Sequence, residues 1–470
     1  MTTIKFGTDG WRAVIAEDYT FANVRLVSQA VADYLHEAHL AERGLIVGYD
    51  TRFGSDRFAA ACAEVLAANG IHVYLTGKPT PTPVISFAIL QKRAGGAAII
   101  TASHNPGSDN GFKYKPEYAG SASPEVVDRL EGKLEANPIK QLPLAEAEKR
   151  GLVERFDAMP SYMQQLGGLV DLDSIKRAGK TIIVDSMYGA GAGYLPQLLD
   201  GGTTKVIPLN AERNPTFPGI RAPEPIDSNL SKLKKVVKES GADIGIAYDG
   251  DADRVGLVDE KGRFVNQLQV FGLLAYYLLD VRGWRGAMVK SISTTSMINR
   301  LGELYGVPVF ETPVGFKYIG PKMIEQKAII GGEESGGFGF DRHIPERDGI
   351  LASLYLIDFM LKRNKTPSKL LEELFTKVGQ HFYDRIDMSY PSEQRPAIVQ
   401  RVADAQPENL GGLQVVKKTT EGGYKFLLQD GSWLLIRFSG TEPLLRVYCE
   451  AHSQEIIPQL LSDGRALTGI

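Results

Sequence analysis

Residues 44–77, GLIVGYDTRFGSDRFAAACAEVLAANGIHVYLTG, contain the pattern that decides the fold. The apolar run at 44–50 predicts a buried strand, residues 56–69 have helical spacing, and Gly70 is a typical helix stop. The run at 71–77 then predicts a second strand. A strand, a helix and a strand in succession are typical of a parallel sheet that is covered by helices.

The same alternation recurs twice farther along the chain. The second unit combines strands at KTIIVDS (180–186) and ADIGIAYDG (242–250) with a helix expected over 188–200. In the third unit, the strand GAMVKSIST (286–294) precedes a helix near 296–305. The strands VPVFETP and KAIIGGEES then follow. We therefore expect three related α/β units in a row.

The C-terminal stretch has a different pattern. Residues 415–440, VVKKTTEGGYKFLLQDGSWLLIRFSG, predict hairpin strands with glycine-containing turns, and a helix is expected near 455–461. This indicates a smaller α+β domain, so four domains are expected. Their predicted bounds are 1–150, 151–259, 260–367 and 368–470, with linkers near 137–155, 258–264 and 364–370.

Length and composition limit the class of protein. A chain of 470 residues exceeds the roughly 250 to 300 residues that one core supports. The net charge of −3 gives no basis for binding nucleic acid or an anionic membrane. The sequence shows neither a membrane-spanning run nor the apolar core of a signal peptide, and it has only two cysteines, Cys62 and Cys449. A cytoplasmic protein is expected.

A candidate nucleophile lies in AAIITASHNPGSDNGFKYK (97–115), where an apolar strand leads into a polar loop that carries Ser103 and His104. Serine, asparagine, proline and glycine are also what ordinary surface turns contain, so the segment alone fits a nucleophile or a turn. A Ser-His-Asp hydrolase is disfavoured, because no GxSxG elbow surrounds Ser103.

A candidate metal site lies in DIGIAYDGDADRVGLVD (243–259). Asp249, Asp251 and Asp253 alternate directly after an apolar strand, and carboxylates this close need a hard cation such as magnesium, calcium or manganese. An EF-hand would place Glu260 at position 12. It would also need glycine where Arg254 stands, so that alternative fails.

Two glycine-containing loops are candidate ligand sites. IIGGEESGGFGF (329–340) carries Glu333, Glu334 and Ser335, whose side chains can hydrogen-bond sugar hydroxyls. WLLIRFSGTEPLLRVYCEA (433–451) offers hydroxyls, backbone amides and guanidinium groups around a turn, which suits a phosphate. The residues concerned are Arg437, Ser439, Gly440, Thr441 and Arg446, and Arg12 is a further candidate phosphate contact. The GxGxG run at 189–193 lacks the spacing of a dinucleotide fingerprint.

Several motifs together resemble the α-D-phosphohexomutase family (phosphoglucomutase/phosphomannomutase). TASHNP with NGFK, DGDADR, GEESGG and RFSGTEP occur in the family's order, and the likeness extends to FGTDGWR, VGYDTR, FPGIRAPEP and HIPERDG. The resemblance implies three related α/β domains with mixed sheets, a smaller α+β C-terminal domain, and an active site in the central cleft.

The resemblance also implies roles for single residues. Ser103 would carry a phosphoryl group and complete a magnesium site with Asp249, Asp251 and Asp253. Arg254 would lie against the transferring phosphate. His104 and Lys113 resemble the family's proton-handling residues, and the sequence does not decide between them.

The implied reaction has two halves, with a sugar bisphosphate between them. The C-terminal loop would hold the phosphate that is not reacting, and Glu333 and Ser335 would hold sugar hydroxyls. GEESGG, and PVGFKYIG with Lys317, resemble the glucose group, so glucose 1-phosphate and glucose 6-phosphate are the expected substrates, with glucose 1,6-bisphosphate as activator.

Other activities stay open at this stage. They are a phosphomannomutase, a dual-specificity phosphohexomutase, an enzyme that forms the sugar bisphosphate, a magnesium phosphatase that uses Ser103, and a non-catalytic sugar-phosphate sensor. The partners expected are small-molecule sugar phosphates, and the sequence does not reveal the oligomeric state.

Overall fold

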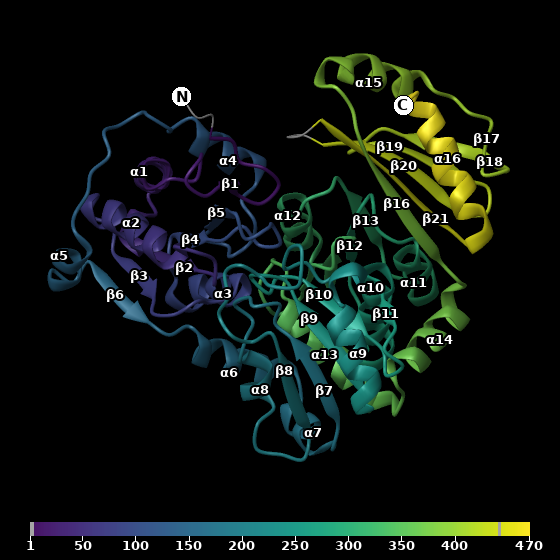
Figure 1. The fold of residues 1–470 in the computed structure, drawn as a ribbon, viewed down its shortest axis with the longest axis horizontal. Helices are drawn as coiled ribbons and strands as arrows, with labels where there is room; N and C mark the ends of the chain where they lie inside the picture. Colours follow the sequence, from purple (N-terminus) through teal and green to yellow (C-terminus); the bar gives the residue numbers. More distant parts are fainter. Residues whose placement is uncertain (1–3, 440–442) are drawn as a thin grey trace.

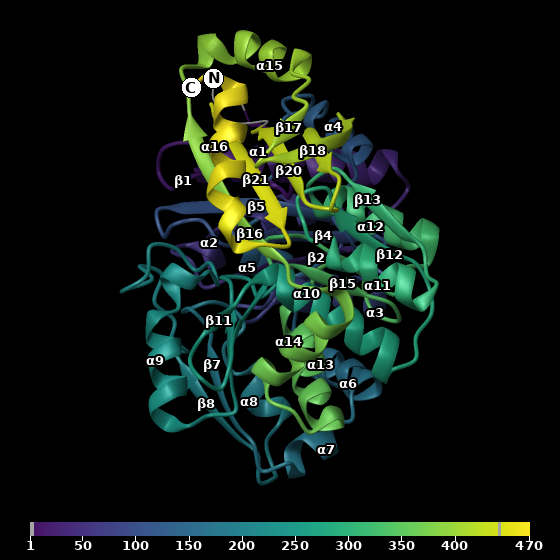
Figure 2. The same ribbon diagram turned by 90° about the vertical axis from the view of Figure 1, so that its right-hand side faces the viewer.

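The computed structural model describes residues 4–439 and 443–470. In Figure 1 the N-terminal domain, purple to blue, lies on the left, and the C-terminal domain, in yellow-green, lies at the upper right. The middle of the chain lies between and below them. Figure 2 shows the same arrangement from the side, with α16 (Ile457–Thr468) lying along the C-terminal sheet. This confirms the expected class of three α/β domains followed by a smaller domain.

The first domain contains a mixed sheet in the strand order β1-β5-β4-β2-β3-β6. Its centre is parallel because helices connect its strands, whereas β5 runs antiparallel to β4 and to β1. Its strands are β1 (Trp11–Val14), β2 (Leu45–Tyr49), β3 (Val73–Thr76), β4 (Gly96–Ile100), β5 (Asp109–Pro116) and β6 (Val153–Phe156). Its helices are α1 (Phe21–Glu37), α2 (Ser55–Ala68), α3 (Thr82–Lys92), α4 (Pro124–Glu131) and α5 (Leu144–Lys149).

The second domain repeats the plan with the order β11-β10-β9-β7-β8. The chain enters it through α6 (Met159–Leu169) and α7 (Leu172–Arg177). Its further elements are β7 (Thr181–Asp185), α8 (Tyr194–Leu198), β8 (Lys205–Leu209), α9 (Ser231–Ser240), β9 (Ile244–Tyr248), β10 (Val255–Val258) and β11 (Phe264–Val265). β7, β8 and β9 are parallel, and β10 returns antiparallel to β9.

The third domain has the order β13-β12-β14-β15, again with an antiparallel last strand. Its strands are β12 (Met288–Ser291), β13 (Val309–Thr312), β14 (Ile330–Gly332) and β15 (Phe338–Phe340). Its helices are α10 (Gln267–Tyr276), α11 (Met297–Tyr305), α12 (Phe316–Gln326), α13 (Gly349–Arg363) and α14 (Pro367–Val378).

The C-terminal domain is an antiparallel sheet in the order β16-β21-β20-β19-β18-β17, with α16 packed on β21. Its strands are β16 (Phe382–Ser389), β17 (Asn409–Leu410), β18 (Leu413–Thr419), β19 (Tyr424–Leu428), β20 (Trp433–Phe438) and β21 (Leu444–Ala451). Before β17 the chain forms α15 (Arg395–Asp404).

The apolar core is shared among the three α/β domains, but not with the C-terminal domain. One continuous core joins the three α/β domains, running from Ile85 on α3 through Tyr248 on β9 to Leu354 on α13. The C-terminal domain has its own core. A small cluster that includes Ile292 and Trp433 packs it against the third domain. The α/β domains are therefore held together more firmly than the fourth domain is held to them.

The structure corrects two expectations about local structure. The helix expected over 188–200 is only Tyr194–Leu198, because residues 188–193 form a glycine-rich turn. The expected linker at 137–155 contains α5 and the start of β6, whose short polar sequence concealed them. The first sheet thus extends past residue 150, and β11 extends the second sheet past residue 259.

The structure also bears on the cysteines and on membrane-spanning segments. The exact domain limits stay predictions. Cys62 and Cys449 are both free and buried. Within residues 4–439 and 443–470, no helix has the length and apolar character needed to cross a membrane.

Candidate active site

Ser103 lies in the loop that follows β4, in an unusual backbone conformation. Its φ is 51°, in the left-handed region that residues other than glycine rarely adopt, and its amide donates to Thr101 Oγ1 at 2.8 Å. The side chain is fully buried. Its hydroxyl donates to Asp249 Oδ2 at 2.8 Å, and His104 Nδ1 lies 3.3 Å away. The loop therefore holds this oxygen in one place, as a nucleophile requires.

Arg52, on the turn after β2, fixes the backbone of the serine loop. The guanidinium is fully buried and donates to the carbonyl oxygens of Ser103 and Asn105, both at 2.6 Å. It also donates to the carbonyls of Pro106 at 2.6 Å and Asp109 at 3.0 Å. The Arg52 side chain thus donates to four carbonyl groups of the serine loop, which stabilises its backbone conformation.

Asp249, Asp251 and Asp253 follow β9 and are fully buried. One oxygen of each lies within 4.8 Å of the others. Burial, and then the two neighbouring carboxylates, raise the pKa of Asp249 well above its ordinary value. Oδ1 of Asp251 and Oδ1 of Asp253 are buried without a hydrogen-bond partner. Unpartnered carboxylate oxygens that converge in this way fit a hard divalent cation.

Glycines let the serine loop and the acidic loop meet. A Cβ on Gly250 would lie 2.4 Å from the carbonyl oxygen of Ser103, so only glycine fits there. The GxGxG run packs against the same loop, since a Cβ on Gly189 would lie 2.7 Å from the Gly250 carbonyl oxygen. The GxGxG run therefore packs against the acidic loop and supports its backbone, which the sequence did not reveal.

Lys113, on β5, places an ammonium group among the carboxylates. Its Nζ lies 2.8 Å from Asp9, 2.7 Å from Asp251 and 3.2 Å from Asp253. Although burial alone would lower it, the Asp251 and Asp253 carboxylates raise the pKa of Lys113 above its ordinary value. Burial, followed by nearby guanidinium groups, instead holds the pKa of His104 well below its ordinary value. One of the two expected proton-handling residues is thus charged and the other neutral.

Arg347, just before α13, connects the loops of three domains. Its guanidinium lies 2.5 Å from Asp9, 2.9 Å from Asp253 and 3.7 Å from Glu333. The side chain is almost completely buried, and its carboxylate partners balance its charge. Arg347 therefore sets the position of the sugar-binding candidate Glu333 relative to the acidic loop.

Arg254 and the glutamate loop lie next to this cluster. The Arg254 amide donates to Asp249 Oδ1 at 3.0 Å, and its guanidinium pairs with Glu224 at 3.2 Å. Arg254 Nε is buried without a partner, which suits an anionic ligand. Burial raises the pKa of Glu333 to about 7, while Arg347 acts in the opposite direction.

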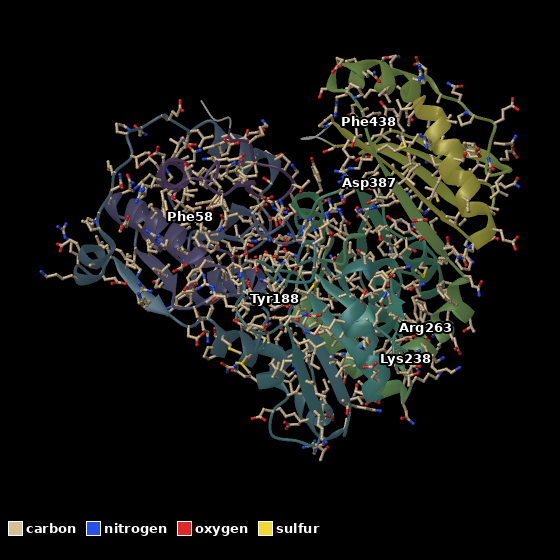
Figure 3. All side chains as sticks on the ribbon, viewed as in Figure 1. Phe58, Tyr188, Lys238, Arg263, Asp387 and Phe438 are labelled. Atoms are coloured by element: carbon tan, nitrogen blue, oxygen red, sulfur yellow. The ribbon has the colours of Figure 1, made fainter. Side chains whose placement is uncertain are left out.

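The C-terminal domain contributes a second positive centre. Arg437 on β20 and Arg446 on β21 are directly paired across the sheet. Like charges in such a pair repel unless an anion lies between them. Arg446 also lies 3.3 Å from Asp387, which Figure 3 labels on the side of this domain nearer the N-terminal domain. Burial and then Glu334 raise the pKa of Tyr448, which lies on β21 between Arg446 and Glu450.

The structure brings most of the expected site residues together. Hydrogen bonds and ion pairs link into one cluster, directly or through Arg347, the residues Ser103, His104, Lys113, Asp249, Asp251, Asp253, Arg254 and Glu333. Arg12 joins it through Asn105, at 2.7 Å. Within residues 4–439 and 443–470, half-buried Lys317 and Ser335 form no hydrogen bond or ion pair with that cluster, and Ser439 is buried in the C-terminal domain. Gly440 and Thr441 lie outside the described residues.

Some residues of the cluster were not singled out from the sequence. Asp9 and Arg347 lie in FGTDGWR and HIPERDG, which were recognised only as motifs. Thr82, on α3, donates to Asp251 at 2.5 Å and lies in no motif. Arg52 lies in VGYDTR. The shared motifs were the available signal for three of these four residues.

Comparisons with known proteins assign the chain to the family that its motifs resemble. Models of phosphoglucomutase/phosphomannomutase domains I, II and III match residues 3–140, 160–262 and 266–378, and the model of the C-terminal domain matches residues 397–465. A Thermococcus kodakarensis phosphoglucomutase/phosphomannomutase is 32% identical, covering 98% of this chain and 97% of the relative.

Two other similar proteins carry different names. A Pyrococcus furiosus protein named as a probable phosphoglucosamine mutase is 31% identical, covering 98% of this chain and 97% of the relative. A crystal structure from Thermus thermophilus, assigned as a phosphomannomutase, is 36% identical, covers both chains completely, and has a TM-score of 0.87. The sugar named thus differs between the relatives.

A buried serine beside converging carboxylates, in a four-domain α/β architecture, defines a phosphate-transferring enzyme. The domain matches identify the kind more closely. The chain belongs to the phosphoglucomutase/phosphomannomutase family, and it is a phosphohexomutase, an isomerase that moves a phosphoryl group on a sugar.

Proposed function

We propose that this enzyme interconverts glucose 1-phosphate and glucose 6-phosphate through phospho-Ser103. The observation that carries the proposal is the 2.8 Å contact between Ser103 Oγ and Asp249, beside two buried and unpartnered carboxylate oxygens. A phosphoserine would add about −1.5 to −2 charges there. Such a site needs positive charge before it can accept a phosphoryl group.

Ser103, Asp249, Asp251 and Asp253 would hold a magnesium ion in this proposal. Bound there, the cation would neutralise charge on the transferring phosphoryl group. Lys113 and Arg254 add positive charge from the protein itself. Glucose 1,6-bisphosphate as activator and a cytoplasmic location stay predictions.

The reaction would proceed in two balanced steps. The free hydroxyl of the sugar phosphate attacks the phosphorus of phospho-Ser103, the bond from phosphorus to Ser103 Oγ breaks, and the hydroxyl proton passes through the neutral His104 to the departing Ser103 oxygen. The glucose 1,6-bisphosphate that results turns around in the cleft. The Ser103 hydroxyl then attacks the other phosphate, the bond from phosphorus to the sugar oxygen breaks, and the serine proton passes to that oxygen. This regenerates the phosphoserine and releases the isomeric monophosphate.

The second positive centre explains how the bisphosphate could be held. Arg437 and Arg446 are paired across β20 and β21. They would hold the phosphate that is not reacting, together with Ser439, Gly440 and Thr441. Arg12 and Lys317 would contact the substrate elsewhere in the cleft. A phosphatase would not need this second centre.

The choice of sugar depends on the glutamate loop. Glu333 and Ser335 would form hydrogen bonds with hydroxyl groups of the sugar. These hydroxyls would lie in similar positions in both orientations of the bisphosphate. Glu334, in the same loop, accepts a hydrogen bond from the Ser291 hydroxyl at 3.0 Å, which fixes its position. Mannose phosphates are the second candidate, because a similar structure from Thermus thermophilus is assigned as a phosphomannomutase.

One assay separates these activities. The protein is mixed with glucose 1-phosphate, magnesium and a trace of glucose 1,6-bisphosphate, and the products are followed by phosphorus NMR. We expect glucose 6-phosphate, with higher kcat/KM than for mannose or glucosamine phosphates. Release of inorganic phosphate alone would show a phosphatase, and binding of sugar phosphate without turnover would show a sensor.

A further inference from the structure

A cavity of about 680 Å³ opens between the N-terminal domain and Arg213 and Pro215 of the second domain, and none of the predicted site residues lines it. The rings of Tyr19, Phe21, Phe53 and Phe58 contribute its apolar walls. Phe58, labelled in Figure 3, is buried. Phe53 is 65% exposed, more than any other large apolar side chain in the described part of the chain. The volume lies within the roughly 300 to 1,000 Å³ of small-molecule sites.

The rim of this cavity is positively charged. Arg57 and Arg213 line it together with a single carboxylate, Asp56. Arg213 pairs with Asp56 at 3.3 Å, whereas Arg57 is exposed and lies 5.5 Å from the centre of the Phe21 ring. The lining therefore has a net positive charge beside an aromatic wall. An apolar ligand with an anionic group complements both features.

The cavity is also connected to the serine loop. Arg213 donates to the carbonyls of Thr51 at 3.1 Å and of Arg52 at 3.3 Å. Arg52 in turn holds four carbonyl groups of the serine loop, including that of Ser103. On the floor, Tyr19 donates to the Gly111 carbonyl at 2.7 Å, on the strand that follows this loop. A ligand here would contact Arg213, which hydrogen-bonds the Arg52 carbonyl, and Tyr19, which hydrogen-bonds the strand after the serine loop.

We propose that this cavity is a second binding site, for a small amphipathic anion with an aromatic or aliphatic body and one carboxylate, phosphate or sulfonate. Its occupancy shifts the turn at residues 51–54 and, through Arg52, the Ser103 loop. Binding is independent of the proposed function, whereas the effect on turnover rests on it.

Binding is tested with the fluorescent dye 8-anilinonaphthalene-1-sulfonate on the full chain. We expect saturable binding of one dye per chain. The uncharged N-phenyl-1-naphthylamine should bind at least about ten-fold more weakly, because it lacks the anion. Equal affinity for the two dyes would overturn the proposal.

Variants locate the dye. Phe53→Ser and Arg57→Gln should each weaken binding of the sulfonate at least about ten-fold, and Arg57→Gln should also remove the preference for the charged dye. Leu304→Ser and Arg177→Gln, which change an exposed apolar residue and an exposed arginine elsewhere, should leave binding unchanged. The same affinity in all four variants would overturn the assignment. So would loss of dye binding that coincides with dimerisation in light scattering, because a second copy would then fill the cavity.

The effect on the serine loop is tested by turnover. At saturating sugar phosphate, the sulfonate dye should change kcat of the wild type at least two-fold and leave kcat of Arg57→Gln unchanged. Dye binding without a change in kcat would overturn the link to the serine loop. Absence of mutase turnover altogether would instead contradict the proposed function, while the dye titration would still test the site.

Discussion

Gly250, in the acidic loop, lies in close contact with the serine loop. Because a Cβ there would lie 2.4 Å from the carbonyl oxygen of Ser103, Gly250→Ala must push the serine away from the aspartates. We expect kcat/KM to fall by about 10²-fold, the usual effect of a misplacement near 1 Å. Steady-state kinetics measure this. Gly168→Ala, where no heavy atom lies within 4 Å, should match the wild type, and similar loss in both variants would contradict the prediction.

Arg347 is a second residue with a role beyond its own loop. Arg347→Met removes one of the cations that pair with Asp9 and Asp253 and leaves Lys113 as their shared partner, so we expect the free energy of unfolding to fall by about 1 to 3 kcal/mol and turnover to decline. Urea titration and activity assays provide the measurements. The exposed Arg300, paired with Glu303, is the control, and Arg300→Met should change stability by less than about 0.5 kcal/mol. An equal effect of both substitutions would disprove the role of Arg347.

Residue patterns alone revealed the site only where its residues are neighbours along the chain, and the link between Ser103 and the aspartates came from the family resemblance. Asp249, Asp251 and Asp253 lie in one loop, so their chemistry is visible without a structure. Arg347 and Thr82 reach the same carboxylates from distant segments. Their contribution depends on how domains pack, which single-sequence patterns do not encode.

At the scale of elements, buried strands were predictable and short polar elements were not. The run at 44–50 contains β2, whose residues are all buried, so its apolar pattern is strong. β6 has two exposed residues among four and was therefore taken for a linker. The glycine-rich segment before α8 has helical spacing, yet it turns to pack on the acidic loop. Packing against the acidic loop, and not helical propensity, therefore determined the structure of residues 188–193.

Glu450, on β21, lies where the C-terminal domain joins the third domain. Although burial acts in the opposite direction, hydrogen bonds from His381 and Ser296 hold the pKa of Glu450 at about 2. A lowered pKa means that the carboxylate stabilises the fold above about pH 4.5, and that this contribution is lost as the pH falls toward 2. It amounts to about 3 kcal/mol.

Replacement of Glu450 tests that contribution. Glu450→Gln should be less stable than the wild type by about 3 kcal/mol at pH 7, and the difference should shrink as the pH falls below about 4.5. Urea titrations at several pH values measure this. Glu303→Gln, at an exposed site, should show no such trend. A difference that is constant with pH would contradict the assigned pKa.

At the scale of the whole molecule, the distribution of apolar contacts indicates that the C-terminal domain can move relative to the other three. The three α/β domains share one apolar core, whereas a small cluster around Ile292 and Trp433 joins the fourth domain to the third. Turning a bisphosphate without losing it calls for an enclosed cleft. We therefore expect the C-terminal domain, set apart at the upper right in Figure 1, to close over the substrate.

Small-angle X-ray scattering measures this closure. The radius of gyration should decrease when glucose 1-phosphate is added to the magnesium-loaded protein, and inorganic sulfate at the same ionic strength should not produce the decrease. An unchanged radius with bound substrate would show that the domains are already closed or do not move.

The central claim is that the Ser103 oxygen carries the phosphoryl group, and intact mass spectrometry with peptide mapping tests it most directly. After incubation with glucose 1,6-bisphosphate and magnesium, we expect one phosphoryl group per chain, located on Ser103. Ser103→Ala should gain none and lose at least ~10³-fold of its turnover. A phosphoryl group on a different residue, or wild-type turnover by Ser103→Ala, would contradict the account.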